Sequence, residues 1–105
     1  MMAPMANVTK LTVNHPLVGT WVTDEEDSNA EFTVFSTGTG LSVRGRDQSD
    51  GEAFDISEVS WDGAALSFTS LMPSTAYRAK HVFRLLPDGK TIEHELTIFE
   101  RWKRR

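Results

Sequence analysis

Alternation of apolar and polar residues is the feature that most constrains the fold of this chain. Over residues 77–85, one face of an extended chain carries Tyr77, Ala79, His81, Phe83 and Leu85. The opposite face carries three basic residues, Arg78, Lys80 and Arg84. Residues 92–98 repeat the pattern, with an apolar face formed by Ile92, His94, Leu96 and Ile98. A period of two is typical of strands with one buried face and does not fit an amphipathic helix.

A four-residue loop, residues 87–90, joins these two segments and predicts their register. Because the loop is short, Leu85 should lie opposite Ile92, which keeps the two apolar faces in phase. The same register places Arg84 opposite Glu93 on the outer face. Surface pairs of this kind contribute roughly a few tenths of a kcal/mol each, which favours this register over a slipped one.

Turn signals at short intervals divide the remaining chain into further short strands. The expected strands are residues 17–23, 30–36, 40–47, 53–61, 65–71, 76–86 and 91–102. The alternation changes phase within residues 53–61. This change predicts either a bulge near Ser57 and Glu58 or a strand that is buried on both faces.

Short sequential strands without crossover helices predict an all-β fold, an antiparallel up-and-down meander. Closing the meander into a small barrel of seven or eight strands would remove its two exposed edges, and a β-sandwich is the rival architecture. The 105 residues suffice for one domain. We therefore expect an N-terminal extension at residues 1–14, in which residues 7–13 could supply one strand, and a single barrel domain at residues 15–105.

Composition excludes several classes of protein. The formal net charge of −4, from 11 basic and 15 acidic residues, argues against a nucleic-acid-binding protein. The absence of cysteine excludes disulfides, a thiolate metal site and a cysteine nucleophile. No apolar run is long enough to span a membrane, and the first residues lack the features of a signal peptide. We therefore expect a cytoplasmic protein without nucleic-acid or membrane partners.

The segment HPLVGTW, residues 15–21, carries a family signal. Gly19 and Trp21 form a Gly-x-Trp on the first strand, which resembles the signature of the calycin superfamily of lipocalins, fatty-acid-binding proteins and avidins. Short bacterial lipocalin-like proteins of unassigned role show a similar opening. The resemblance implies a barrel in which Trp21 plugs the closed end and a basic residue near the last strand, here Arg101, packs across it. A cation over an indole face contributes about 0.5–2 kcal/mol.

The inward face of the predicted hairpin holds the candidate ligand-binding residues, which are Tyr77, His81, Phe83, His94 and Trp102. His81 and His94 are diagonal neighbours in the predicted register, with rings expected within about 8 Å of each other. Two imidazoles can bind a polar ligand, act as acid and base, or supply half a metal site. The wider lining adds Phe32, Val34, Leu41, Val43, Phe54, Phe68 and Leu96.

Three interpretations of function follow from these residues. The first is a lipocalin-like domain that binds a small apolar ligand in the barrel lumen, with no cofactor, metal or catalytic residue. The second is a barrel isomerase or cyclase that uses His81, His94 or Tyr77 as acid or base. The third is an interaction module without a pocket, which forms a homodimer through open edge strands. A metal site is disfavoured, because only Glu58 or Glu100 could supply a third ligand.

Overall fold

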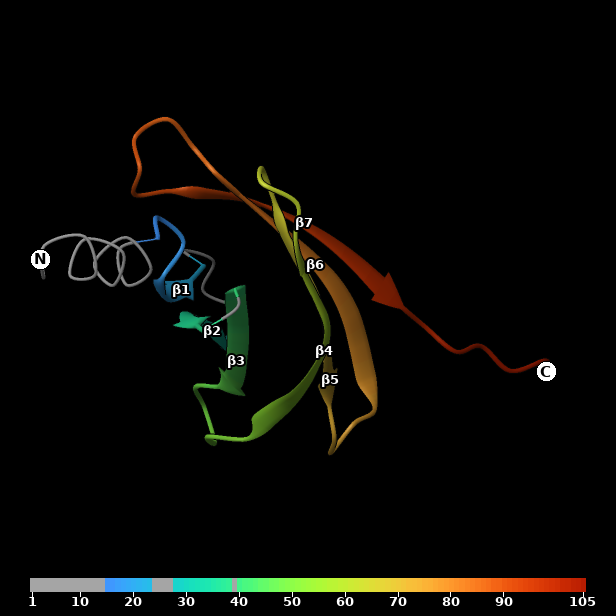
Figure 1. The fold of residues 1–105 in the computed structure, drawn as a ribbon. Coiled ribbons are helices and arrows are strands. Elements are labelled where there is room, and N and C mark those ends of the chain that lie inside the picture. Colours follow the sequence, from blue (N-terminus) through green and yellow to red (C-terminus); the bar gives the residue numbers. More distant parts are fainter. Residues whose placement is uncertain (1–14, 24–27, 39) are drawn as a thin grey trace, which may run out of the picture.

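The computed structural model describes residues 15–23, 28–38 and 40–105, and within these ranges it contains seven β-strands. They are β1 (Gly19–Val22), β2 (Ala30–Thr37), β3 (Gly40–Asp47), β4 (Ala53–Trp61), β5 (Leu66–Met72), β6 (Tyr77–Leu85) and β7 (Ile92–Phe99). Each strand pairs antiparallel with the next along the chain. The sheet curls into a half-barrel (Figure 1). The all-β, up-and-down fold is therefore confirmed.

The predicted β6–β7 hairpin is present in the predicted register. Leu85 lies opposite Ile92, and the pairing continues in phase to the end of β7. In the connecting loop the carboxylate of Asp88 accepts hydrogen bonds from the backbone N–H groups of Lys90 and Thr91, both at 2.9 Å. An aspartate that binds backbone groups two and three residues ahead stabilises a tight turn. The turn therefore holds the register that the alternation requires.

The phase change in β4 is a bulge. The pairing with β5 shifts register between Ser57 and Ser60, and Glu58 has a positive φ of 55°. The carboxylate of Glu58 accepts a hydrogen bond from the Thr69 hydroxyl at 3.2 Å. Because the bulge adds one residue to β4, Val59 returns to the core face after Ile56. Of the two predicted explanations, the bulge is the one observed.

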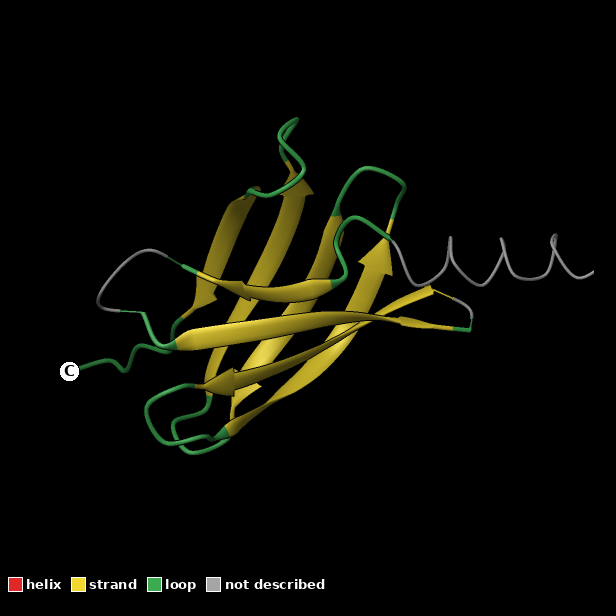
Figure 2. Cartoon of the chain, turned by 90° about the vertical axis from the view of Figure 1, so that its left-hand side faces the viewer, coloured by secondary structure: helices red, strands yellow, loops and turns green. Residues whose placement is uncertain are grey.

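The sheet curls without closing, which differs from the expected full barrel. In the described ranges β1 pairs only with β2, and β7 pairs only with β6. Figure 2 shows the curled sheet from the side. β1 has four residues and β7 has eight, so β1 offers too few backbone groups to cover the edge of β7. The predicted eighth strand, residues 7–13, lies outside the described residues.

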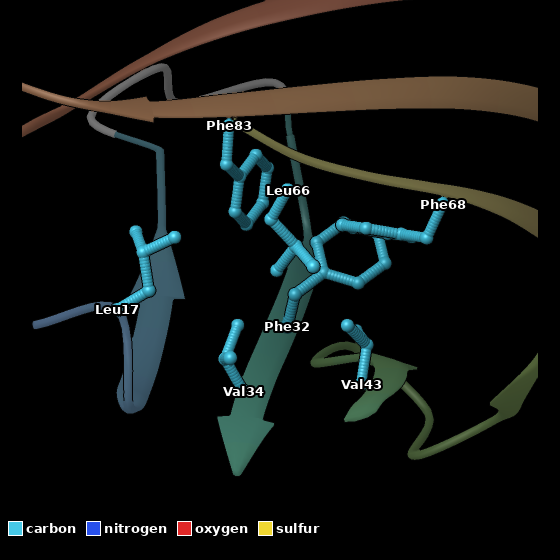
Figure 3. Close-up of a cluster of buried hydrophobic side chains, with 7 residues drawn as sticks. All are labelled: Leu17, Phe32, Val34, Val43, Leu66, Phe68 and Phe83. Atoms are coloured by element: carbon cyan, nitrogen blue, oxygen red, sulfur yellow. The ribbon is translucent and has the colours of Figure 1, made fainter. Parts of the chain in front are cut away.

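The core fills the inside of the curl with side chains from β2, β3, β5 and β6 and from the turn before β1. The buried apolar residues are Leu17, Phe32, Val34, Val43, Leu66, Phe68, Ala79 and Phe83. Figure 3 shows how seven of these side chains point toward one another. Within the described residues, no helix is long and apolar enough to cross a membrane.

Gly45 on β3 allows two aromatic rings to pack over the strand. It pairs with Phe32 on β2 and Phe54 on β4. A Cβ at Gly45 would lie 2.7 Å from the Phe32 ring and 2.9 Å from the Phe54 ring.

We therefore expect Gly45→Ala to lower the free energy of unfolding by about 1–3 kcal/mol in urea denaturation, as overpacking does. Gly40→Ala on the same strand is the matched control, because its added Cβ would meet no atom within 4 Å. Equal losses for the two variants would contradict this explanation.

Candidate ligand-binding site

The inside of the curled sheet opens into a pocket of about 300 Å³. It is lined by Ser28, Asn29, Ala30, Phe32, Asp47, Phe54, Ser70, Met72, Tyr77, Ala79, His81, His94 and Leu96. Three of the five predicted ligand-binding residues, Tyr77, His81 and His94, are among them. The volume is at the lower end of the range for small-molecule pockets.

The rings of the two histidines are closer to each other than the sequence predicted. Nδ1 of His81 lies 2.9 Å from Nε2 of His94, and the ring planes are nearly parallel, at 7°. The short N···N distance places the rings edge to edge, so that the N–H of one ring points at the lone pair of the other. In the neutral pair one ring donates this hydrogen bond and the other accepts it.

Ser70 on β5 extends the pair into a chain of three residues. Its hydroxyl Oγ lies 2.8 Å from Nε2 of His81, so both ring nitrogens of His81 have a partner. A hydroxyl both donates and accepts, and it fits either tautomer of His81. Sequence analysis missed Ser70, although a serine between Phe68 and Met72 on the inward positions of β5 is the available signal.

Aromatic rings enclose His81 on the inner side of the sheet. Phe68 stacks on its face at 4.7 Å between centroids, and Phe32 contacts it at 4.7 Å. His81 is only 5% exposed, whereas His94 is exposed toward the open side of the half-barrel. The chain Ser70–His81–His94 therefore runs from the buried interior to solvent.

Burial lowers the pKa of both imidazoles. For His81, loss of solvation is the main cause and the neighbouring His94 adds to it, and together they lower the pKa from 6.5 to about 4. Loss of solvation also lowers the pKa of His94. Both rings are therefore neutral at pH 7, and the pair presents uncharged donors and acceptors to the pocket.

The rim of the pocket carries a carboxylate, Asp47. The hydroxyl and the backbone N–H of Ser49 donate hydrogen bonds to it at 2.5 Å and 2.8 Å, and they lower its pKa below the usual value. Asp47 is therefore a fixed negative charge at neutral pH. Among the residues that the structure describes, no three histidine or acidic side chains are close enough to hold a metal ion.

The other predicted site residues lie elsewhere. Phe83 is 2% exposed and packs in the core, with its ring edge-on to His94 at 5.2 Å. Trp102 is 88% exposed beyond the end of β7, where its indole N–H donates to Glu100 at 2.9 Å. The β6–β7 pairing ends at Arg78 and Phe99, so Trp102 lies three residues beyond the last paired residue of β7.

The wider predicted lining divides into two groups. Phe32, Phe54 and Leu96 line the pocket. Val34, Val43 and Phe68 are buried in the core, and Leu41 packs against it. The division has a physical reason: Leu17 enters the curl from the turn before β1, so one end of the half-barrel is filled and only the other end stays open.

The Gly-x-Trp segment lies at the end of the half-barrel that Leu17 fills. Gly19 has a φ of +148°, which favours glycine, and the indole N–H of Trp21 donates to the Leu17 carbonyl at 3.0 Å. Trp21 is partly buried and packs against the core. Arg101 lies exposed in the tail after β7, and in the described chain the arginines that stack on aromatic rings are Arg44 and Arg78.

Comparison of the chain with protein-family models, with curated proteins and with solved structures finds no significant match.

Proposed function

We propose that this protein is a calycin-like domain that binds a small, mostly apolar molecule carrying one uncharged polar group. The observation that carries the proposal is the hydrogen-bonded chain Ser70–His81–His94 on the wall of a mainly apolar pocket. Pockets that combine apolar walls with a few placed polar groups are typical of small-molecule sites. The Gly-x-Trp opening and the curled meander support the calycin assignment.

The electrostatics of the site favour an uncharged polar group on the ligand. Nε2 of His94 is occupied by His81, which leaves Nδ1 of His94 to bond to a ligand. Since the tautomer of the pair can change, Nδ1 can accept from a hydroxyl or donate to a carbonyl. A carboxylate on the ligand would be repelled by Asp47 at the rim and would find no cation on the neutral histidines.

The test begins with native mass spectrometry on protein purified gently from its own host. We expect a reproducible mass excess that disappears on denaturation, and the excess identifies the compound. Calorimetric titration of that compound should then show about tenfold weaker binding to His94→Phe, because the variant keeps the ring but loses the hydrogen bond. Thr97→Val, which removes a hydroxyl from the opposite face of β7, is the control and should bind normally. A protein that carries no small molecule, or equal binding by the two variants, would refute the proposal.

Acid–base catalysis is a second candidate for the same pocket. It is favoured by the neutral imidazole of His94, which can accept a proton at Nδ1 while its Nε2–H donates the hydrogen bond to Nδ1 of His81. Incubating the identified compound with the protein discriminates the two functions by NMR. Conversion that stops in His94→Phe supports an isomerase or cyclase, whereas an unchanged compound supports binding alone.

A further inference from the structure

Strand β7 lies at one edge of the sheet and, among the described strands, has a neighbour on one side alone. In the described ranges it pairs only with β6, and seven of its eight residues are exposed. Its exposed apolar side chains are Leu96, Ile98 and Phe99, with Trp102 following in the tail. An unprotected edge of this kind pairs readily with another strand. The other edge strand, β1, has only four residues.

The charges along β7 and the tail change sign from one end to the other. Glu93 and Glu95 lie near the start, and the tail after the strand is basic, with Arg101, Lys103, Arg104 and Arg105. Within one chain, Arg84 on β6 contacts both glutamates, at 4.0 Å and 2.5 Å. Both glutamates lie exposed along the edge strand, where the basic residues of a second strand could also reach them.

We propose that β7 and residues 100–103 pair antiparallel with the same segment of a second copy, about a twofold axis at Ile98. An antiparallel pair about a twofold axis places the acidic start of each strand beside the basic end of the other. With the axis at Ile98, Glu95 faces Arg101 of the partner subunit, and Glu93 faces Lys103 of the partner subunit. These residues alternate on the outer face, where charged cross-strand pairs are favourable.

The same register also completes the pocket. On the inner face Ile98 meets its own copy, and His94 faces Trp102 of the partner subunit. That indole would cover the open side of the pocket beside the exposed His94, which gives a role to a tryptophan that is 88% exposed in the single chain. The hydrogen bond between Trp102 and Glu100, two residues apart, is consistent with an extended tail. The covering of the pocket by Trp102 rests on the proposed function, whereas the pairing of β7 between two copies does not.

Sedimentation velocity over a concentration series, without any ligand, tests the dimer. We expect a monomer–dimer equilibrium in the wild type that weakens with salt. Arg101→Glu with Lys103→Glu should raise the dissociation constant at least about tenfold, because it places like charges opposite Glu95 and Glu93. The matched control, Arg104→Glu with Arg105→Glu, makes the same charge change in the same tail outside these pairs, and its effect should be clearly smaller.

A mixing experiment then tests the pairing itself. Glu93→Lys with Glu95→Lys should also be monomeric alone, yet it should form a heterodimer with the Arg101→Glu, Lys103→Glu variant, since every charge then faces its opposite. Circular dichroism checks that each variant is folded. If the lysine variant is not folded, because Arg84 lies beside the changed residues, Glu93→Gln with Glu95→Gln replaces it and should weaken the dimer. A monomeric wild type, higher polymers, or equal effects of the two tail variants would overturn the proposal.

The contribution of Trp102 is measured separately. Trp102→Ala keeps the facing charges, so the variant should still dimerise while binding the identified compound several-fold more weakly. Normal binding by a dimeric Trp102→Ala variant would overturn the completed pocket and leave the dimer standing. A wild-type dimer that carries no compound would refute the proposed function and leave the β7 pairing intact.

Discussion

Replacing Phe32 with alanine is expected to lower the free energy of unfolding by about 3–5 kcal/mol, as large-to-small substitutions in cores do. Phe32 is 5% exposed and contacts aromatic rings from three other strands. The centroid distances are 5.8 Å to Phe54, 5.1 Å to Phe68 and 6.2 Å to Phe83. The Phe32 ring lies between strands on opposite sides of the curled sheet. These strands cannot move together to fill the cavity that alanine would leave. Small domains are stable by about 5–15 kcal/mol, so the loss is a large part of the total.

Urea denaturation followed by tryptophan fluorescence measures this loss. Phe35→Ala is the matched control, because Phe35 lies on the same strand but faces outward, where Arg44 stacks on its ring at 4.8 Å. We expect the control to cost about 1 kcal/mol or less. If Phe32→Ala is unfolded, Phe32→Leu should cost about 1 kcal/mol, because it keeps most of the volume. A Phe32→Ala variant as stable as Phe35→Ala would contradict the central role of this ring.

The fold could be predicted from the sequence because its determinants are local. A period of two, short turns and a four-residue loop specify the β6–β7 hairpin and its register, in which Phe83 faces His94. The phase change in β4 indicates an irregularity near Ser57 and Glu58 for the same reason, although the alternation left open both a bulge and a strand buried on both faces. Each of these features depends on residues that are close together along the chain.

The site was predicted only in part, because it depends on contacts between separate strands. The His81–His94 contact follows from one hairpin, whereas the Ser70 contact also requires the β5–β6 register. Closure of the barrel depends on the length of β1, which alternation alone does not specify. The alternation does place Trp102 on the inner side, but strand β7 ends at Phe99, before that side chain can reach the pocket.

Acid should destabilise the protein through His81. Burial lowers the pKa of its imidazole from 6.5 to about 4 in the folded state, with a contribution from His94. Between these two values the unfolded chain binds a proton that the folded chain excludes, so stability falls as the pH falls. The stability is fully present above about pH 6.5 and is lost progressively toward about pH 4. The main structural cause is the burial of the ring against Phe32 and Phe68, and the neighbouring His94 adds to it.

The expected loss in free energy of unfolding between about pH 7 and pH 5 is about 2 kcal/mol, from the linkage of a single group with these two pKa values. Over this range most carboxylates stay charged, so the histidines dominate the slope. His81→Phe keeps a ring between Phe32 and Phe68 but cannot be protonated. The variant should be less stable at pH 7, because Ser70 loses its partner, and its slope between pH 7 and pH 5 should be much shallower. NMR titration of the wild-type ring is the direct check. A His81 ring that titrates near 6.5, or an unchanged slope in His81→Phe, would show that the buried pair does not exclude the proton.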